Sequence, residues 1–136
     1  MRVLVFGAGV IGSVYAGSLL RAGHDVVLLA RGPRLVDLQT HGLILEDAES
    51  GQRSVVPVPS VGELAPDDRF DLVLVPVRAE QLRSTLPVLT SMTDDSDVLF
   101  FGNTANRRAE LTAALGSRVL FGFPAAGGTR DGAIVK

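Results

Sequence analysis

Two kinds of segment alternate along the chain, distinguished by how hydrophobic and polar residues follow one another. Short runs of almost wholly apolar residues, rich in valine and leucine, predict strands that are buried on both faces. These runs lie at residues 3–6, 26–30, 71–77, 97–101 and 118–123. Strands that are apolar on both faces are typical of a parallel sheet that is covered by helices on its two sides.

The segments between these runs follow the helical period instead. We predict helices over residues 10–23, 34–41, 79–92 and 106–115. In the first of them, Val10, Val14, Leu19 and Leu20 can share one face of the helix. The alternation of buried strands with helices predicts an α/β fold with right-handed crossovers between parallel strands.

One stretch departs from this alternation. Residues 43–47 and 53–59 flank a turn around Ser50 and Gly51, which predicts a β-hairpin. Residues 125–136 are glycine-rich at first and then strand-like. We therefore expect a Rossmann-type, doubly wound and mainly parallel sheet, with the hairpin at its periphery.

Composition narrows the class of protein. The chain has 136 residues with 46% hydrophobic residues and a net charge of −2, as expected for one domain with its own core. It has no cysteine, which excludes disulfides and thiolate metal sites, and its two histidines show no ligand spacing. We therefore expect no metal site. The absence of a basic patch predicts no nucleic-acid binding, and the absence of a long apolar run predicts no membrane span. We expect a cytoplasmic location.

The first predicted strand runs directly into a G-x-G-x-x-G motif. Its residues are Gly7, Ala8, Gly9, Val10, Ile11 and Gly12. Between a strand and a helix this pattern predicts a dinucleotide site, in which the first glycine allows a tight turn, the second admits a pyrophosphate and the third allows close packing. The alternative is a strand-to-helix turn that needs its glycines for packing alone.

The end of the second predicted strand indicates which dinucleotide would bind. NAD sites usually carry an acidic residue there, about 20 residues past the motif, to bind the ribose 2′-hydroxyl. This chain has Arg31 at that point and Arg34 shortly after it. A guanidinium group suits a 2′-phosphate, so we predict NADP(H) as the cofactor. Alternatively, Arg31 is an exposed loop arginine; a flavin site would favour an acidic residue there.

The sequence resembles the opening half of ketopantoate reductases, also called 2-dehydropantoate 2-reductases. The segments that carry this resemblance are residues 1–32, 71–82, 98–106 and 121–134. The resemblance implies an NADPH-dependent reduction of a 2-oxo acid to a 2-hydroxy acid, as in pantothenate biosynthesis. It also implies that residues 7–12 hold the pyrophosphate and that Arg31 holds the 2′-phosphate.

Further site residues come from the resemblance alone. It places Arg78 beside the nucleotide, Asn103 at the nicotinamide ribose or the substrate as a catalytic residue, and Gly128 at the nicotinamide side. From the residues themselves, the alternatives are that Asn103 is a turn or cap residue ahead of the next helix and that Arg78 is a solvated helix-start residue. Arg78 replaces a common lysine, and Thr104 stands where glycine is common, which allows a different 2-oxo acid as substrate.

Ketopantoate reductases continue into a helical domain that supplies a lysine as general acid. Such a domain is absent from residues 1–136, and Lys136 is the only lysine. We therefore expect this chain to bind NADP(H) without turnover. We also expect the end near Phe123, Pro124, Ala125 and Ile134 to be disordered or covered, for example in a homodimer. The alternative function is a standalone NADP(H)-binding or sensor module.

Overall fold

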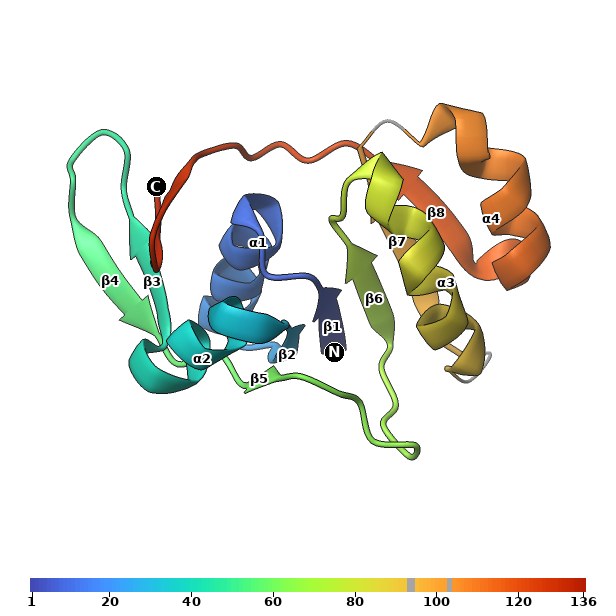
Figure 1. The fold of residues 1–136 in the computed structure, drawn as a ribbon, viewed down its shortest axis with the longest axis horizontal. Coiled ribbons are helices and arrows are strands. Elements are labelled where there is room, and N and C mark those ends of the chain that lie inside the picture. Colours follow the sequence, from blue (N-terminus) through green and yellow to red (C-terminus); the bar gives the residue numbers. More distant parts are fainter. Residues whose placement is uncertain (93–94, 103) are drawn as a thin grey trace.

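A computed structural model describes residues 1–92, 95–102 and 104–136, and it confirms the predicted α/β fold (Figure 1). Six strands form the main sheet, in the order β5-β2-β1-β6-β7-β8, with every neighbouring pair parallel. The strands of this sheet are β1 (Arg2–Phe6), β2 (Asp25–Leu29), β5 (Ser60–Val61), β6 (Leu72–Val75), β7 (Asp97–Phe101) and β8 (Val119–Gly122). The parallel pairing of β1 with β2 is the one that a doubly wound sheet requires.

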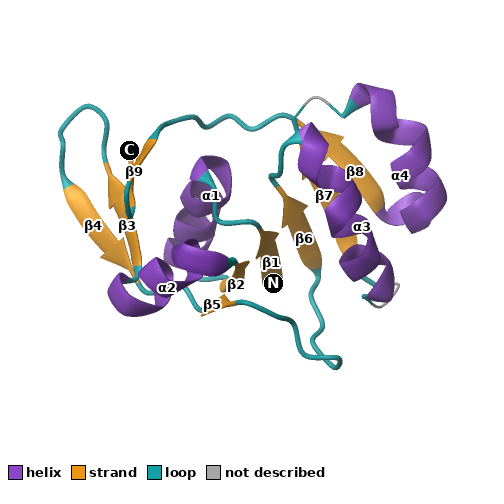
Figure 2. Cartoon of the chain, viewed as in Figure 1, coloured by secondary structure: helices purple, strands orange, loops and turns teal. Residues whose placement is uncertain are grey.

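Helices cover both faces of this sheet (Figure 2). They are α1 (Val10–Arg21), α2 (Gly32–His41), α3 (Leu82–Ser91) and α4 (Arg108–Leu115), with short 3-10 turns at Ala79–Gln81, Ala105–Arg107 and Gly116–Arg118. In β1, Val3 and Val5 pack in the core beneath α1 and α2, whereas Leu4 and Phe6 pack in the core beneath α3 and α4. Burial on both faces explains the unbroken apolar run in the sequence.

The order of the strands locates the place where a ligand can enter. The chain passes from β1 through α1 to β2 on one side of β1, and later returns to β6 on the other side. Connections that leave a central strand in opposite directions open a crevice at the carboxyl ends of the strands. The glycine motif follows β1 at this switch point.

The predicted hairpin is peripheral to the main sheet and does not join it. It forms a second sheet with the end of the chain, in the order β4-β3-β10-β9. The strands are β3 (Leu43–Glu46), β4 (Arg53–Val56), β9 (Arg130–Asp131) and β10 (Ile134–Val135). Pairing of β10 with β3 half-buries Ile134 within the chain itself, which corrects the expectation that this residue is disordered or covered by a partner chain. Phe123 is ordered and 78% exposed in the single chain, and its coverage by a partner stays a prediction.

Helix α1 lies between the main sheet and the second sheet, and its buried face differs from the predicted one. The fully buried residues are Gly12, Ser13, Ala16 and Gly17, whereas Val14, Leu19 and Leu20 are only half-buried. A Cβ atom added to Gly17 would lie 2.7 Å from the Leu45 side chain of β3. Small residues are needed here because the helix packs closely on both sides.

Among the residues that the structure describes, no helix has the length and apolar character that crossing a membrane requires.

Candidate functional site

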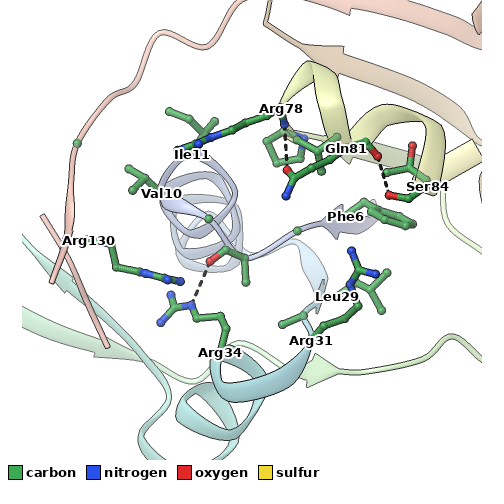
Figure 3. A pocket seen from close by; sticks show the side chains of 18 of the residues that line it. Phe6, Val10, Ile11, Leu29, Arg31, Arg34, Arg78, Gln81, Ser84 and Arg130 are labelled. Atoms are coloured by element: carbon green, nitrogen blue, oxygen red, sulfur yellow. Dashed lines mark hydrogen bonds between the residues drawn. The ribbon is translucent and has the colours of Figure 1, made fainter. Parts of the chain in front are cut away.

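A cleft of about 880 Å³ opens at the carboxyl ends of β1, β2 and β6 (Figure 3). It brings together most of the residues that the sequence predicted for a nucleotide. The predicted residues that line it are Gly7, Ala8, Gly9, Val10, Ile11, Arg31, Arg78 and Gly128. Four segments that are distant in the sequence therefore meet at the switch point of the sheet, where α/β proteins bind their ligands.

The glycine loop has a different reason for glycine at each of its three positions. Gly7 has a φ of 125°, and its N–H donates to the carbonyl oxygens of Val5 and Leu29, each at 3.1 Å. Gly9 begins α1, and a Cβ atom added to it would meet nothing within 4 Å. A Cβ atom on Gly12 would lie 2.0 Å from the Gly7 carbonyl oxygen. Gly9 thus leaves open space for a ligand, while Gly12 lies behind the cleft and allows close packing.

Helix α1 points its amino-terminal end at this open space. Val10 and Ile11 line the cleft, and the first turn of the helix carries no acidic side chain. The first N–H groups of a helix lack intrahelical partners and carry the positive end of the helix dipole. An anion in the cleft next to Gly9 can therefore accept hydrogen bonds from the backbone.

The side chains of the cleft add positive charge to this backbone site. Of the described residues that line it, four are arginines and none is acidic, and the arginines are Arg31, Arg34, Arg78 and Arg130. Arg31 is exposed at the start of α2 and forms no ion pair or hydrogen bond through its side chain within the described part of the chain. The chain as a whole has a net charge of −2, so this local excess of cations favours a polyanionic ligand.

Arg34 has a structural role that the sequence did not reveal. Its side chain is buried, with the residue 9% exposed, and donates to the carbonyl oxygen of Ala8 at 3.0 Å and to Ser13 Oγ at 3.0 Å. It also donates to the carbonyl oxygen of Ala133 at 3.3 Å. Burial, followed by the nearby charge of Arg130, lowers the pKa of Arg34 from its ordinary value. Arg34 therefore ties the glycine loop, α1 and the β9–β10 turn together.

Replacing Arg34 by methionine is expected to lower the free energy of unfolding by about 1–3 kcal/mol. The variant removes three hydrogen bonds and leaves buried acceptors without a donor, which costs on this order. Urea denaturation measures the change, with Arg83→Met as a control because Arg83 is exposed on α3. Equal stability of Arg34→Met and the unaltered chain would contradict the role of Arg34 as a tie.

The far wall of the cleft comes from the end of the chain. Gly128 packs so closely that a Cβ atom on it would lie 2.0 Å from the Lys136 carbonyl oxygen. Thr129 and Lys136 exchange two backbone hydrogen bonds of 2.9 Å each. Arg130 lines the same wall and was not among the residues predicted from the sequence. Its position in a β-like tail could not reveal that the tail folds back against the glycine loop.

The opposite wall adds polar groups from the start of α3. Gln81, Ser84 and Thr85 line the cleft, and none of them was predicted. The Gln81 side-chain oxygen accepts a hydrogen bond from the backbone N–H of Arg78 at 3.2 Å, which fixes the turn that carries Arg78.

The predicted catalytic residue, Asn103, lies outside the described residues, so its role stays a prediction. Its neighbour Thr104 is buried and donates its backbone N–H to the Gly102 carbonyl oxygen at 2.9 Å. In the described part of the chain, no three histidine or acidic side chains gather in a way that could hold a metal ion.

Comparisons with known proteins agree on one family. The family described as ketopantoate reductase PanE/ApbA matches residues 3–135. The chain is 26% identical over 136 residues to the 2-dehydropantoate 2-reductase of Pyrococcus horikoshii, and 32% identical over 96 residues to that of Mesorhizobium japonicum. These matches cover 100% and 70% of this chain.

Solved structures share the fold. D-mandelate dehydrogenase in a ternary structure with NADH and anilino(oxo)acetate superposes with a TM-score of 0.88 over 99% of this chain, at 22% identity. The chain spans less than half of its relatives: 42% of the Pyrococcus horikoshii protein, 29% of the Mesorhizobium japonicum protein and 45% of the D-mandelate dehydrogenase chain.

Proposed function

The chain belongs to the ketopantoate reductase family PanE/ApbA, and on that premise we propose that it is the NADP(H)-binding domain of a reductase. The proposed reaction converts a 2-oxo acid, 2-dehydropantoate or a relative of it, into the 2-hydroxy acid. The proposal extends to a second, helical domain that would complete the substrate site. The proposal also includes a cytoplasmic location and a role in pantothenate biosynthesis, both of which were expected from the sequence.

One observation carries the choice of cofactor: the glycine loop opens into a cleft that holds four arginines and, within the described residues, no acidic side chain. A Rossmann site for NAD usually presents a carboxylate to the ribose 2′-hydroxyl, and this cleft presents Arg31 instead. A carboxylate would repel a 2′-phosphate, whereas a guanidinium group binds it with charge-assisted hydrogen bonds. The residues present therefore fit NADP(H).

In this proposal each part of the cleft binds a different part of the cofactor. The backbone at Gly9, Val10 and Ile11 donates to the pyrophosphate, and the open space at Gly9 admits its oxygens. Arg31 holds the 2′-phosphate and Arg78 lies beside the nucleotide. Gly128 lies at the nicotinamide side, and glycine is required there because a Cβ atom would lie 2.0 Å from the Lys136 carbonyl oxygen. When bound, the cofactor supplies a hydride to the keto carbon.

The substrate class rests on the family and on Asn103, for which we propose contact with the nicotinamide ribose or the substrate. The name of a solved relative adds to this, since D-mandelate dehydrogenase was solved with NADH and an oxo-acetate compound. That relative binds NADH, so the preference of this chain for NADPH rests on Arg31 and needs its own test.

Arg31→Ala is expected to remove the preference for NADPH over NADH. Hydrogen bonds to charged groups contribute about 1.5–3 kcal/mol, or roughly 10- to 150-fold in affinity, and exposure of Arg31 places the effect toward the lower end. Titration of both nucleotides against both proteins, followed by fluorescence or calorimetry, measures it. NADH affinity should be unchanged in the variant. An unaltered chain that binds NADPH and NADH equally well would refute the assignment.

The second candidate is a nucleotide-binding or sensor module that performs no chemistry. It is favoured by the cleft, in which the described side chains include no lysine, histidine or carboxylic acid as a proton donor. The two candidates differ in the effect of a 2-oxo acid. A reductase domain joined to the helical domain that completes its substrate site binds 2-dehydropantoate more tightly when NADP⁺ is present, whereas a sensor module binds the nucleotide alone. For either candidate, we propose that the exposed apolar end at Phe123 forms a homodimer contact. Sedimentation velocity would detect the dimer.

A further inference from the structure

Arg34 and Arg130 point toward one another beside the glycine loop, on the side of the cleft away from Arg31 (Figure 3). They come from α2 and from β9, which lie in different parts of the fold. Two cations that face one another repel, and the charge of Arg130 contributes to the lowered pKa of Arg34. Such an arrangement is stabilised when an anion enters between the two groups.

Arg34 is held rigidly in this arrangement. Its three acceptors, on Ala8, Ser13 and Ala133, leave it little rotamer freedom. The hydrogen bond to Ala133 also anchors the β9–β10 turn, whose first strand carries Arg130. A guanidinium group has five N–H donors, and these bonds use three of them. Two N–H donors have no partner among the described residues, and Arg34 lines the cleft.

Arg130 is not engaged by the protein. Its side chain is exposed and takes part in no ion pair or hydrogen bond with any described residue. The carboxylates of the same sheet are already paired: Lys136 Nζ lies 3.7 Å from Glu46 and 4.0 Å from Asp131, and Arg53 donates to Glu46 at 2.6 Å. Asp37 on α2 is the carboxylate that raises the pKa of Arg34, and it forms no ion pair with it in the described structure.

We propose that Arg34 and Arg130 form a second phosphate subsite of the cleft. This subsite is separate from Arg31 and binds a phosphate group of the dinucleotide. This inference rests on the proposed function, because that function supplies the ligand. The anchored Arg34 fixes one side of the subsite, and Arg130 closes on the phosphate from the other. Because Arg31 is assigned to the 2′-phosphate and Arg34 is bonded to Ala8 of the glycine loop, the phosphate at this subsite is the pyrophosphate, which NADPH and NADH share.

The test is nucleotide binding by the full 136-residue chain and its Arg130→Gln variant. Affinity for NADPH should fall roughly 5- to 10-fold, the range for a charge-assisted bond at an exposed site. Because both nucleotides carry the pyrophosphate, affinity for NADH should fall together with that for NADPH. Unchanged affinity for NADH in Arg130→Gln would contradict the subsite. Arg130→Lys retains the charge and should recover part of the loss.

Arg83→Gln is the matched control, since it removes the same charge from an exposed position on α3 outside the cleft. A salt titration adds a readout that a structural role would not move, because the loss in Arg130→Gln should shrink at about 0.5 M salt. The subsite is overturned if Arg130→Gln binds NADPH like the unaltered chain. It is also overturned if Arg83→Gln loses as much NADPH affinity as Arg130→Gln, because the loss then comes from the overall charge of the protein and not from the subsite.

Inorganic pyrophosphate separates failure of the subsite from failure of the proposed function. An unaltered chain that binds pyrophosphate through Arg130 but binds neither dinucleotide would retain the subsite and refute the function. A chain that binds NADPH with no dependence on Arg130 would retain the function and refute the subsite. Absence of binding to all three ligands would refute both.

Discussion

The 136-residue chain is expected to bind NADPH and to reduce 2-dehydropantoate at least about 1000-fold more slowly than the usual enzymatic range of roughly 1–1000 per second. Hydride transfer to a carbonyl needs a proton source positioned at the oxygen, in a site that excludes water. The described side chains of the cleft include hydroxyl, amide and guanidinium groups but no lysine, histidine or carboxyl group. The single lysine, Lys136, has its ammonium near Glu46 and Asp131 on the second sheet.

NADPH oxidation at 340 nm measures this rate, and the 2-dehydropantoate 2-reductase of Pyrococcus horikoshii is the positive control in the same assay. Binding of NADPH by the chain should be measured on the same sample, so that slow turnover is not confused with an unfolded protein. Turnover at an ordinary enzymatic rate would contradict the expectation. The proton donor would then have to be sought among Ser84, Thr85 and Thr129 in the cleft.

Gly12→Ala is expected to lower the free energy of unfolding by about 2–4 kcal/mol, which corresponds to roughly 10 °C in Tm. The added Cβ atom would lie 2.0 Å from the Gly7 carbonyl oxygen and 3.2 Å from the Pro76 ring. A backbone carbonyl cannot rotate away as a flexible side chain can, so α1 must move off β1. Alanine is a better helix former than glycine by about 1 kcal/mol, and this gain offsets only part of the cost.

Gly9→Ala is the matched variant, with the same chemical change three residues earlier. Gly9 has φ −71° and ψ −168°, which alanine adopts freely, and its Cβ atom would meet nothing within 4 Å. We expect a loss of stability of about 1 kcal/mol or less, and NADPH binding that is weaker by roughly 10-fold or more because the methyl group occupies the approach to the pyrophosphate. Thermal melts and nucleotide titrations distinguish the two glycines. Equal melting temperatures for both variants would contradict the assignment of Gly12 to packing.

The order of the main strands and helices could be predicted from the sequence because each element carries its own local signal. Runs such as residues 71–75 and 97–101 are apolar on both faces, and only strands covered on two sides use such runs. The glycine motif gave the position of the cleft for a similar reason. Its spacing is a local requirement of a strand that turns directly into a helix, as Gly7 with its positive φ and Gly12 with its close contact confirm.

Other features depend on residues that are distant in the sequence. The face of α1 was predicted from its large apolar residues, and the structure buries Gly12, Ser13, Ala16 and Gly17 instead. The periodicity argument assigns the buried face to the most hydrophobic residues. A helix that packs between two sheets instead needs small side chains on its buried surfaces. The second sheet was missed for a related reason: the hairpin and the tail each resemble a strand, but nothing local indicates that β10 pairs with β3.

The sequence by itself therefore determined the fold class, the glycine loop and the arginine at the end of β2. Each of these rests on a pattern of neighbouring residues whose physical requirement is local. Only the tertiary structure decided that Arg34 is buried beneath the glycine loop and that Arg130 faces it. From the sequence alone, both residues would be expected to be ordinary solvated arginines. They form a proposed site because residues 130–135 fold back and place them against the carboxyl end of β1.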